Sequence, residues 1–264
     1  MTFLQQLIIA IVQGITEFLP ISSSGHLILI PYLTDFPDQG PLIDVAVHIG
    51  SLLAIILYFR KDVAGLARGG FAAIGLGDDP AQRRLFWFIL VGTIPAVALG
   101  LFLKLGGYLE GFRTTDLVAV NLIVYGILLG LADRFGRQEK SYEDMSLRDA
   151  VLVGLAQALA LIPGTSRSGS TMTAARALGY KRPEAARFSF LLAIPAVAGA
   201  GLLAALDLAE ASAAMQIDAV VTGVLTFLAA MATMMFLMSF LQRASMMVFV
   251  IYRVALGAAL LLLF

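Results

Sequence analysis

Long apolar stretches dominate this chain, and short polar segments separate them. Six windows have the roughly 17–25 mostly apolar residues that a membrane-spanning helix requires, and they cover residues 43–59, 85–103, 115–133, 187–206, 217–240 and 246–264. Of all residues, 59% are hydrophobic and only 14% are charged, whereas soluble domains carry about 25% charged residues. The pattern predicts an all-α polytopic membrane protein, with one membrane domain over residues 1–264.

Two further apolar stretches are each broken by a polar turn. Residues 3–33 are interrupted at Glu17–His26, and residues 150–178 are interrupted at Pro163–Thr171. Two short apolar runs around a turn rich in Pro, Gly and Ser are typical of a re-entrant hairpin, because broken backbone at membrane depth needs protein or a polar cavity around it. We therefore expect six transmembrane helices plus two re-entrant helical hairpins.

The two hairpins are related by a constant offset in the sequence. Gln13 and Gln157 occupy matching places and lie 144 residues apart. Three spans follow each hairpin, and because three is odd, the second half enters the membrane from the opposite side. The half-repeats 1–135 and 147–264 therefore form an inverted-topology repeat, whose site is expected near the midplane where the broken helices meet.

The distribution of basic residues orients this topology. Fourteen of the eighteen Lys and Arg residues fall in the segments on one side, and two fall on the other. Such an excess marks the cytoplasmic side, so both termini are expected outside and loops such as 60–84 in the cytoplasm. The remaining two, Arg167 and Arg253, lie within the membrane, where a charge is costly and marks a functional candidate. Arg253 fits either a substrate clamp or a pair with an acidic residue.

The first polar turn groups a carboxylate with hydroxyls and an imidazole. Gln13 and Glu17 are four residues apart and share one helix face. A buried carboxylate needs a cationic partner, a metal or a proton. The turn that follows adds Ser22, Ser23, Ser24 and His26. Histidine suits acid–base chemistry, although serines and glycine also form plain turns and helix caps.

The second polar turn has the composition of an anion-binding loop. Glycine and hydroxyl residues that open a helix present converging N–H groups to an anion. Arg167 can hold a phosphate with two parallel hydrogen bonds, and its candidate neighbours in this role are Ser166, Ser168, Gly169 and Thr171. The alternative is a salt bridge between Arg167 and Glu17, and both interpretations are compatible with an empty site.

Other features of the sequence limit the kinds of site that the chain can form. Asp44 and His48 are four residues apart near the outer end of the first span, either supporting the site or forming a satisfied buried pair. The chain has no cysteine and only two histidines, which argues against thiol chemistry and a zinc site. Its formal net charge is zero, so nothing indicates nucleic acid as a partner.

These motifs resemble those of the bacitracin-resistance family of undecaprenyl-diphosphatases. The run QGITEFLPISSSGHL at Gln13–Leu27 is similar to the family's first signature, and PGTSRSG at Pro163–Gly169 is similar to its second. Further stretches, Phe188–Pro195 and Gly92–Ala96, also match. The resemblance covers essentially the whole chain. Gln13 stands where the family often has glutamate.

The resemblance implies an enzyme integral to the plasma (inner) membrane, with a site that opens to the outside. Its reaction would release the terminal phosphate of undecaprenyl diphosphate, recycle the lipid carrier for peptidoglycan synthesis and confer bacitracin resistance. It also implies a divalent cation, Mg²⁺ or Ca²⁺, and no organic cofactor. A prenyl-phosphate flippase that uses the same pocket is the alternative, and a homodimer is left open.

Residue roles follow from matching the motifs position by position. We expect Glu17, Ser23, His26 and Arg167 to be catalytic, with Glu17 also a candidate metal ligand. Either Ser23 is the nucleophile, activated by His26 or Glu17, or a water molecule positioned by the same pair attacks directly. The expected substrate-binding residues are Gln13, Ser22, Ser24, Ser166, Ser168, Gly169 and Thr171.

Overall fold

The computed structural model describes the chain except for residues 35, 37–38, 109, 113 and 264. In the described part, the fold consists of helices and contains no named strand. The α-helices are α1 (Phe3–Thr16), α2 (Ser23–Leu33), α3 (Pro41–Tyr58), α4 (Arg60–Ala73), α5 (Pro80–Leu105), α6 (Thr115–Phe135), α7 (Leu147–Leu159), α8 (Arg167–Ala177), α9 (Arg182–Glu210), α10 (Ala213–Leu241) and α11 (Met247–Leu263). Two short 3₁₀ turns, η1 (Glu110–Phe112) and η2 (Tyr142–Asp144), lie in the connections.

Each of the six predicted apolar windows is a helix. Of these helices, α3, α5, α6 and α10 are long and apolar enough to cross a membrane, and α11 is a shorter apolar helix. Helix α1, from the first interrupted stretch, is also a shorter apolar helix. Exposed apolar side chains cover their outer surfaces, such as Leu53 on α3 and Phe236 on α10, which are 51% and 56% exposed. A surface of this kind is stable in hydrocarbon, so the fold is that of a multi-pass membrane protein.

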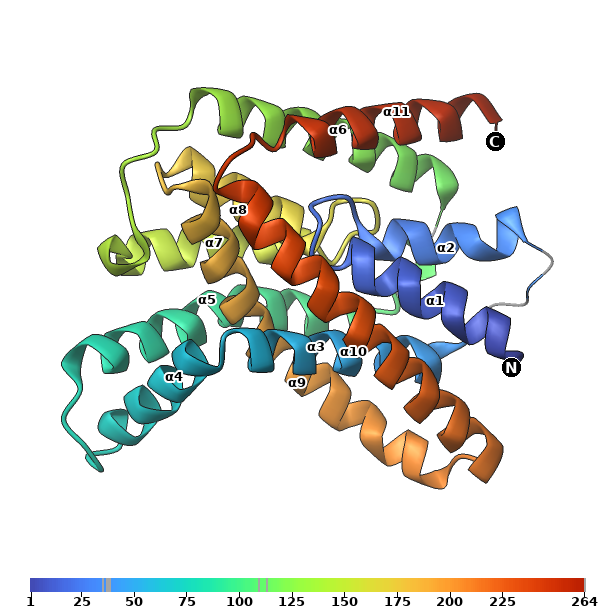
Figure 1. The fold of residues 1–264 in the computed structure, drawn as a ribbon, viewed down its shortest axis with the longest axis horizontal. Coiled ribbons are helices and arrows are strands. Elements are labelled where there is room, and N and C mark those ends of the chain that lie inside the picture. Colours follow the sequence, from blue (N-terminus) through green and yellow to red (C-terminus); the bar gives the residue numbers. More distant parts are fainter. Residues whose placement is uncertain (35, 37–38, 109, 113, 264) are drawn as a thin grey trace.

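The helices run between two ends of the molecule, with both chain termini at the same end (Figure 1). The turns that join α4 to α5 and α6 to α7 lie at the opposite end (Figure 1). These turns belong to the predicted cytoplasmic segments 60–84 and 134–149, which together hold nine of the fourteen Lys and Arg residues on the basic side, in agreement with the separation of charge predicted from the sequence.

The two interrupted stretches fold as pairs of short helices. The pair α1–α2 has its turn over residues 17–22, and α7–α8 has its turn over residues 160–166. The two turns meet near the centre of the molecule (Figure 1), where the Ser168 hydroxyl donates to the Leu19 carbonyl at 3.2 Å. Phe18 packs edge-on against Phe190 of α9, with ring centroids 5.4 Å apart, so the buried core continues up to this junction.

One prediction needs correction, because residues 60–73 form helix α4 within what was expected to be a loop. The segment is rich in charge, but Val63 and Leu66 give it a short apolar stripe that packs against the core. Gly69 lets α4 approach the backbone of α5, since a Cβ there would lie 2.2 Å from the Gln82 carbonyl oxygen. Packing against α5, rather than the helix propensity of its own residues, therefore stabilises α4.

Candidate active site

The two polar turns have the same local geometry. Ser22 and Ser166 have φ values of 77° and 72°, a region that residues other than glycine seldom adopt. Each serine is the N-cap of the next helix, and its hydroxyl accepts a hydrogen bond from the N–H of Gly25 or Gly169. A cap of this kind satisfies one of the free N–H groups at the helix start. Both turns thus aim a helix N-terminus toward the centre of the protein.

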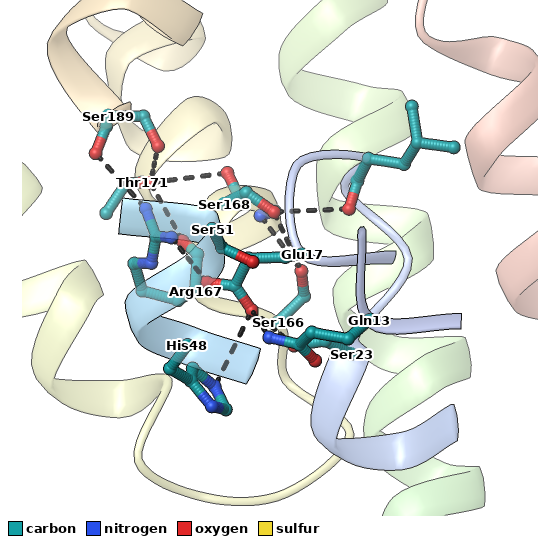
Figure 2. A network of polar contacts seen from close by, with 12 residues as sticks. Gln13, Glu17, Ser23, His48, Ser51, Ser166, Arg167, Ser168, Thr171 and Ser189 are labelled. Atoms are coloured by element: carbon teal, nitrogen blue, oxygen red, sulfur yellow. Dashed lines mark hydrogen bonds and ion pairs between the residues drawn. The ribbon is translucent and has the colours of Figure 1, made fainter. Parts of the chain in front are cut away.

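Glu17 and Arg167 join the two turns directly. The Arg167 guanidinium donates to Oε1 of Glu17 at 2.6 Å, and the Glu17 residue is only 7% exposed. The ion pair that the sequence left as an alternative is therefore present (Figure 2). Buried opposite charges at this distance satisfy each other, and removing one would leave the other uncompensated.

The second oxygen of Glu17 faces three other polar groups (Figure 2). Ser23 donates its hydroxyl proton to Oε2 at 2.7 Å, and the Gln13 amide donates at 3.1 Å. Nε2 of His48 lies 3.8 Å away. Since Nδ1 of His48 is 2.6 Å from the Asp44 carbonyl oxygen and donates to it, its Nε2 is directed at the carboxylate.

A cavity of about 400 Å³ opens beside this cluster. Its polar wall is made by Glu17, Ser23, Ser24, Asp44, His48, Gln157, Ser166 and Arg167. The apolar part of its wall includes Ala96, Leu161 and Val197. The cavity can therefore take a ligand with a charged head and a hydrocarbon tail.

The remaining predicted residues support the two turns rather than line the cavity. The Thr171 hydroxyl donates to the Arg167 carbonyl at 2.8 Å and contacts the Ser189 hydroxyl at 2.5 Å. Ser168 contacts the hydroxyl of Ser166 and bonds to the first turn. Gly169 is placed by packing, because a Cβ there would lie 2.6 Å from Nη1 of Arg253. Likewise, Gln13 is fully buried behind Glu17.

His26 is not placed beside Glu17, in contrast to the expected arrangement. Its Nδ1 lies 2.7 Å from the Ser22 carbonyl, and its Nε2 lies 2.6 Å from the hydroxyl of Tyr252 on α11. The two rings stack with their centroids 5.6 Å apart. These contacts turn the imidazole toward α11, so His48 is the histidine next to the carboxylate. A catalytic role for His26 stays a prediction.

Arg253 pairs with carbonyl groups, which corrects both alternatives considered from the sequence. It is fully buried and donates to the carbonyl oxygens of five residues at 2.9–3.3 Å, namely Pro20, Asn121, Leu122, Gly164 and Thr165. Pro20 belongs to the first turn, while Gly164 and Thr165 belong to the second. One side chain thus clamps both turns against α6.

Sequence reasoning missed Ser189 and Gln157. The backbone carbonyl of Ser189 accepts from Arg167 at 3.3 Å (Figure 2), and its hydroxyl contacts Thr171. A serine within an apolar span carries no signal of its own, since polar contacts between packed helices also explain it. Gln157 did carry a signal, because it matches Gln13 in the other half.

The fold and this site define a multi-pass membrane protein in which two broken helices meet around a buried carboxylate–arginine pair. The chain belongs to the family described as bacitracin resistance protein BacA, whose family model matches residues 6–259. It is 66% identical to an undecaprenyl-diphosphatase of Erythrobacter litoralis, with all of both chains covered. It is also 47% identical to proteins of the same name from Idiomarina loihiensis, with both chains covered completely, and Alteromonas mediterranea, with 99% and 98% covered.

Proposed function

We propose that this protein hydrolyses undecaprenyl diphosphate to undecaprenyl phosphate and inorganic phosphate. The observation that carries the proposal is the meeting of Glu17, Ser23 and Arg167, from two separate turns, at the polar wall of one cavity. The names of the related enzymes supply the substrate. The reaction would return the carrier lipid to peptidoglycan synthesis and remove the form that bacitracin captures, which fits a family described by bacitracin resistance.

The cavity has the two walls that this substrate requires. Arg167 and the N–H groups at the start of α8 supply positive charge and donors for a diphosphate. The apolar wall is suited to the first isoprene units, and the rest of the chain extends into the bilayer. Because phosphoryl transfer spreads negative charge over the phosphate oxygens, a fixed guanidinium beside them lowers the barrier.

We assign the first chemical step to Ser23. Its Oγ attacks the terminal phosphorus, its proton passes to Glu17 across the 2.7 Å hydrogen bond, and the bond to the bridging oxygen breaks. Undecaprenyl phosphate leaves. Water then attacks the phosphoserine and returns a proton to Oγ, while Glu17 gives its proton to the departing phosphate. Direct attack by a water molecule on the same phosphorus is the alternative, with Glu17 again as the base.

A divalent cation, Mg²⁺ or Ca²⁺, fits this site only when shared with the substrate. In the described part of the chain, no three His, Cys, Asp or Glu side chains are grouped to hold a metal ion. Glu17 is the carboxylate at the polar wall, with Asp44 also lining the cavity. Such cations are often held by one or two carboxylates together with substrate phosphates and water. When bound, the ion would neutralise charge on the diphosphate.

Metal removal gives the first test. We expect a chelator to lower phosphate release strongly, and we expect Mg²⁺ or Ca²⁺ to restore it. The thermal stability of the substrate-free protein should change little, because the protein alone does not complete the coordination shell. Full activity after exhaustive chelation would show that Glu17 acts without a metal.

We further propose that the chain has six transmembrane helices, with α1–α2 and α7–α8 as re-entrant hairpins of an inverted repeat in the plasma membrane. The matching φ angles and caps of Ser22 and Ser166, 144 residues apart, support this arrangement. Asp44 and His48, which line the cavity, lie in the first half of α3. That half is near the end that holds both termini, so the site opens to the outside.

Phosphate release by purified protein in detergent tests the proposal. We expect turnover of undecaprenyl diphosphate by the wild-type protein and strong loss in Glu17→Gln, which keeps the shape but removes the charge. Detergent abolishes transport, so release there requires chemistry. An inactive wild-type protein would refute the phosphatase and favour the alternative, a flippase that binds prenyl phosphates between its paired broken helices.

A further inference from the structure

Gln157 on α7 has an unusual place in the cavity wall. The residue is 3% exposed, yet neither its amide oxygen nor its amide nitrogen has a hydrogen-bond partner among the described residues. Buried polar atoms in proteins are bonded in the large majority of cases, because an unmade hydrogen bond costs about 1–3 kcal/mol. A side chain with both atoms unpaired therefore calls for a ligand.

The cavity supplies the place for that ligand. Gln157 lines it together with Glu17, Ser23 and Arg167, the groups that carry the proposed chemistry. Its amide is thus buried and unbonded at the wall of the space in which a substrate headgroup would lie.

The internal repeat explains why this amide is free. Its counterpart Gln13 is followed four residues later by Glu17, and the Gln13 amide donates to that carboxylate at 3.1 Å. Four residues after Gln157 stands Leu161, which also lines the cavity and offers no polar partner. Of the two matching glutamines, Gln13 therefore supports the carboxylate in the first half, whereas Gln157 is left unbonded in the second.

We infer that Gln157 is a substrate-binding residue, whose amide N–H group donates to an oxygen of the diphosphate while its amide oxygen accepts from water in the site. This inference rests on the proposed phosphatase function. A neutral donor complements Arg167, since it binds a phosphate oxygen without adding a second positive charge beside Glu17. Because Gln157 lies on α7, its amide would also contact the diphosphate from a different element than Glu17 and Arg167.

The test is Gln157→Leu, which keeps the approximate size and removes both polar atoms. Because it deletes two unsatisfied groups, we expect an unchanged or higher Tm in the absence of ligand. We expect kcat/KM for undecaprenyl diphosphate to fall roughly 10- to 100-fold, as for the loss of one hydrogen bond to a charged group. The rise in Tm given by methylene diphosphonate, an uncleavable diphosphate, should also be smaller than in wild type.

Gln82→Leu is the matched control. Gln82 is a second glutamine with an unpaired buried amide oxygen, but it lines a separate pocket beside Arg84 and Arg187. Its variant should retain wild-type kcat/KM and the wild-type response to the diphosphonate. If Gln157→Leu does not fold, Gln157→Met replaces it, and we expect the same changes in Tm and in kcat/KM.

Two results would overturn the inference. The first is a wild-type kcat/KM in Gln157→Leu. The second is a lower kcat/KM together with a lower Tm in the absence of ligand, which would indicate a structural role. Both differ from failure of the proposed function, in which the wild-type protein itself releases no phosphate.

Discussion

At the scale of single residues, Glu17 is shared between groups that compete for its charge. One oxygen accepts from Arg167 and the other from Ser23 and Gln13. A diphosphate that enters the cavity would draw the guanidinium toward its own oxygens, because a phosphate offers more negative charge than one carboxylate. Glu17 would then be freer to accept the Ser23 proton, so binding of the substrate prepares the base.

Arg167 is expected to be indispensable for turnover. We expect Arg167→Ala to lower kcat/KM by roughly 10²- to 10³-fold, the loss typical for one strong transition-state donor. Arg167→Lys should recover little, because an ammonium group cannot reproduce the planar fork. Initial rates of phosphate release measure both. Arg137→Ala is the control, since that side chain is 80% exposed and belongs to the turn after α6; equal rates in all variants would contradict the assignment.

The role of Ser23 can be separated from that of a water molecule. With undecaprenyl diphosphate labelled in the terminal phosphate, we expect a rapid acid quench to trap phosphate on Ser23, and we expect Ser23→Ala to abolish the trapped species. Ser24→Ala should still form it, because Ser24 lacks the hydrogen bond to Glu17 that Ser23 makes. A single turnover in ¹⁸O-water that labels the phosphate with no covalent species would assign the attack to water.

Part of this site could be predicted from the types of residue in the two turns. The orientation of the other side chains depends on contacts with residues distant in the sequence. Glu17 and Arg167 could be paired from the sequence because each is a costly charge in an apolar segment. The orientation of His26 could not, since it depends on Tyr252, 226 positions later. His48 was expected only as a supporting or self-satisfied residue, and it reaches Glu17 because α3 packs beside the first turn.

At the scale of elements, the junction of the two hairpins depends on Arg253. Its guanidinium binds carbonyls from both turns and from α6, and Gly126 and Gly169 leave room for it. Buried carbonyl groups in a turn have no helix partner, so this side chain supplies the donors they lack. It holds the two turns together and is not among the residues that line the cavity.

Arg253→Met should therefore destabilise the protein as a whole. Removing the donors leaves several buried carbonyls unsatisfied, and we expect a loss of about 3 kcal/mol or more in the free energy of unfolding. Thermal unfolding in detergent measures the effect, and activity should fall in parallel. Arg243→Met is the control, because Arg243 is exposed in the turn before α11. Normal stability in Arg253→Met would show that the turns hold without the clamp.

Helices could be predicted where a long apolar stretch, or its interruption, is visible in the sequence itself. The six apolar windows and the two broken stretches became helices near the expected bounds, because a span and a Pro/Gly/Ser interruption are visible locally. Helix α4 was missed, since its charged sequence resembles a solvated loop and its stability comes from close packing on α5. The unusual φ angles of Ser22 and Ser166 also have no local signal, as serine normally avoids them.

At the scale of the whole molecule, the segregation of charge and the place of the cavity agree. The turns at the end opposite the termini (Figure 1) belong to segments 60–84 and 134–149, which together hold nine of the eighteen Lys and Arg residues. The cavity is lined from the first half of α3, toward the end with the termini. An enzyme with this orientation would release its phosphate outside the cell membrane and keep the lipid product within the bilayer.

The orientation can be measured directly because the chain has no cysteine. Ala214→Cys places one thiol at the start of α10, and Asp78→Cys places one in the turn before α5; both positions are exposed. Since the segment 60–84, rich in Lys and Arg, is expected in the cytoplasm, a membrane-impermeant maleimide should label Ala214→Cys in intact spheroplasts and Asp78→Cys only after lysis. The reverse pattern would place the termini and the cavity on the cytoplasmic side. In that case the enzyme would act on substrate in the inner leaflet, although the chemistry assigned to Glu17, Ser23 and Arg167 would be unaffected.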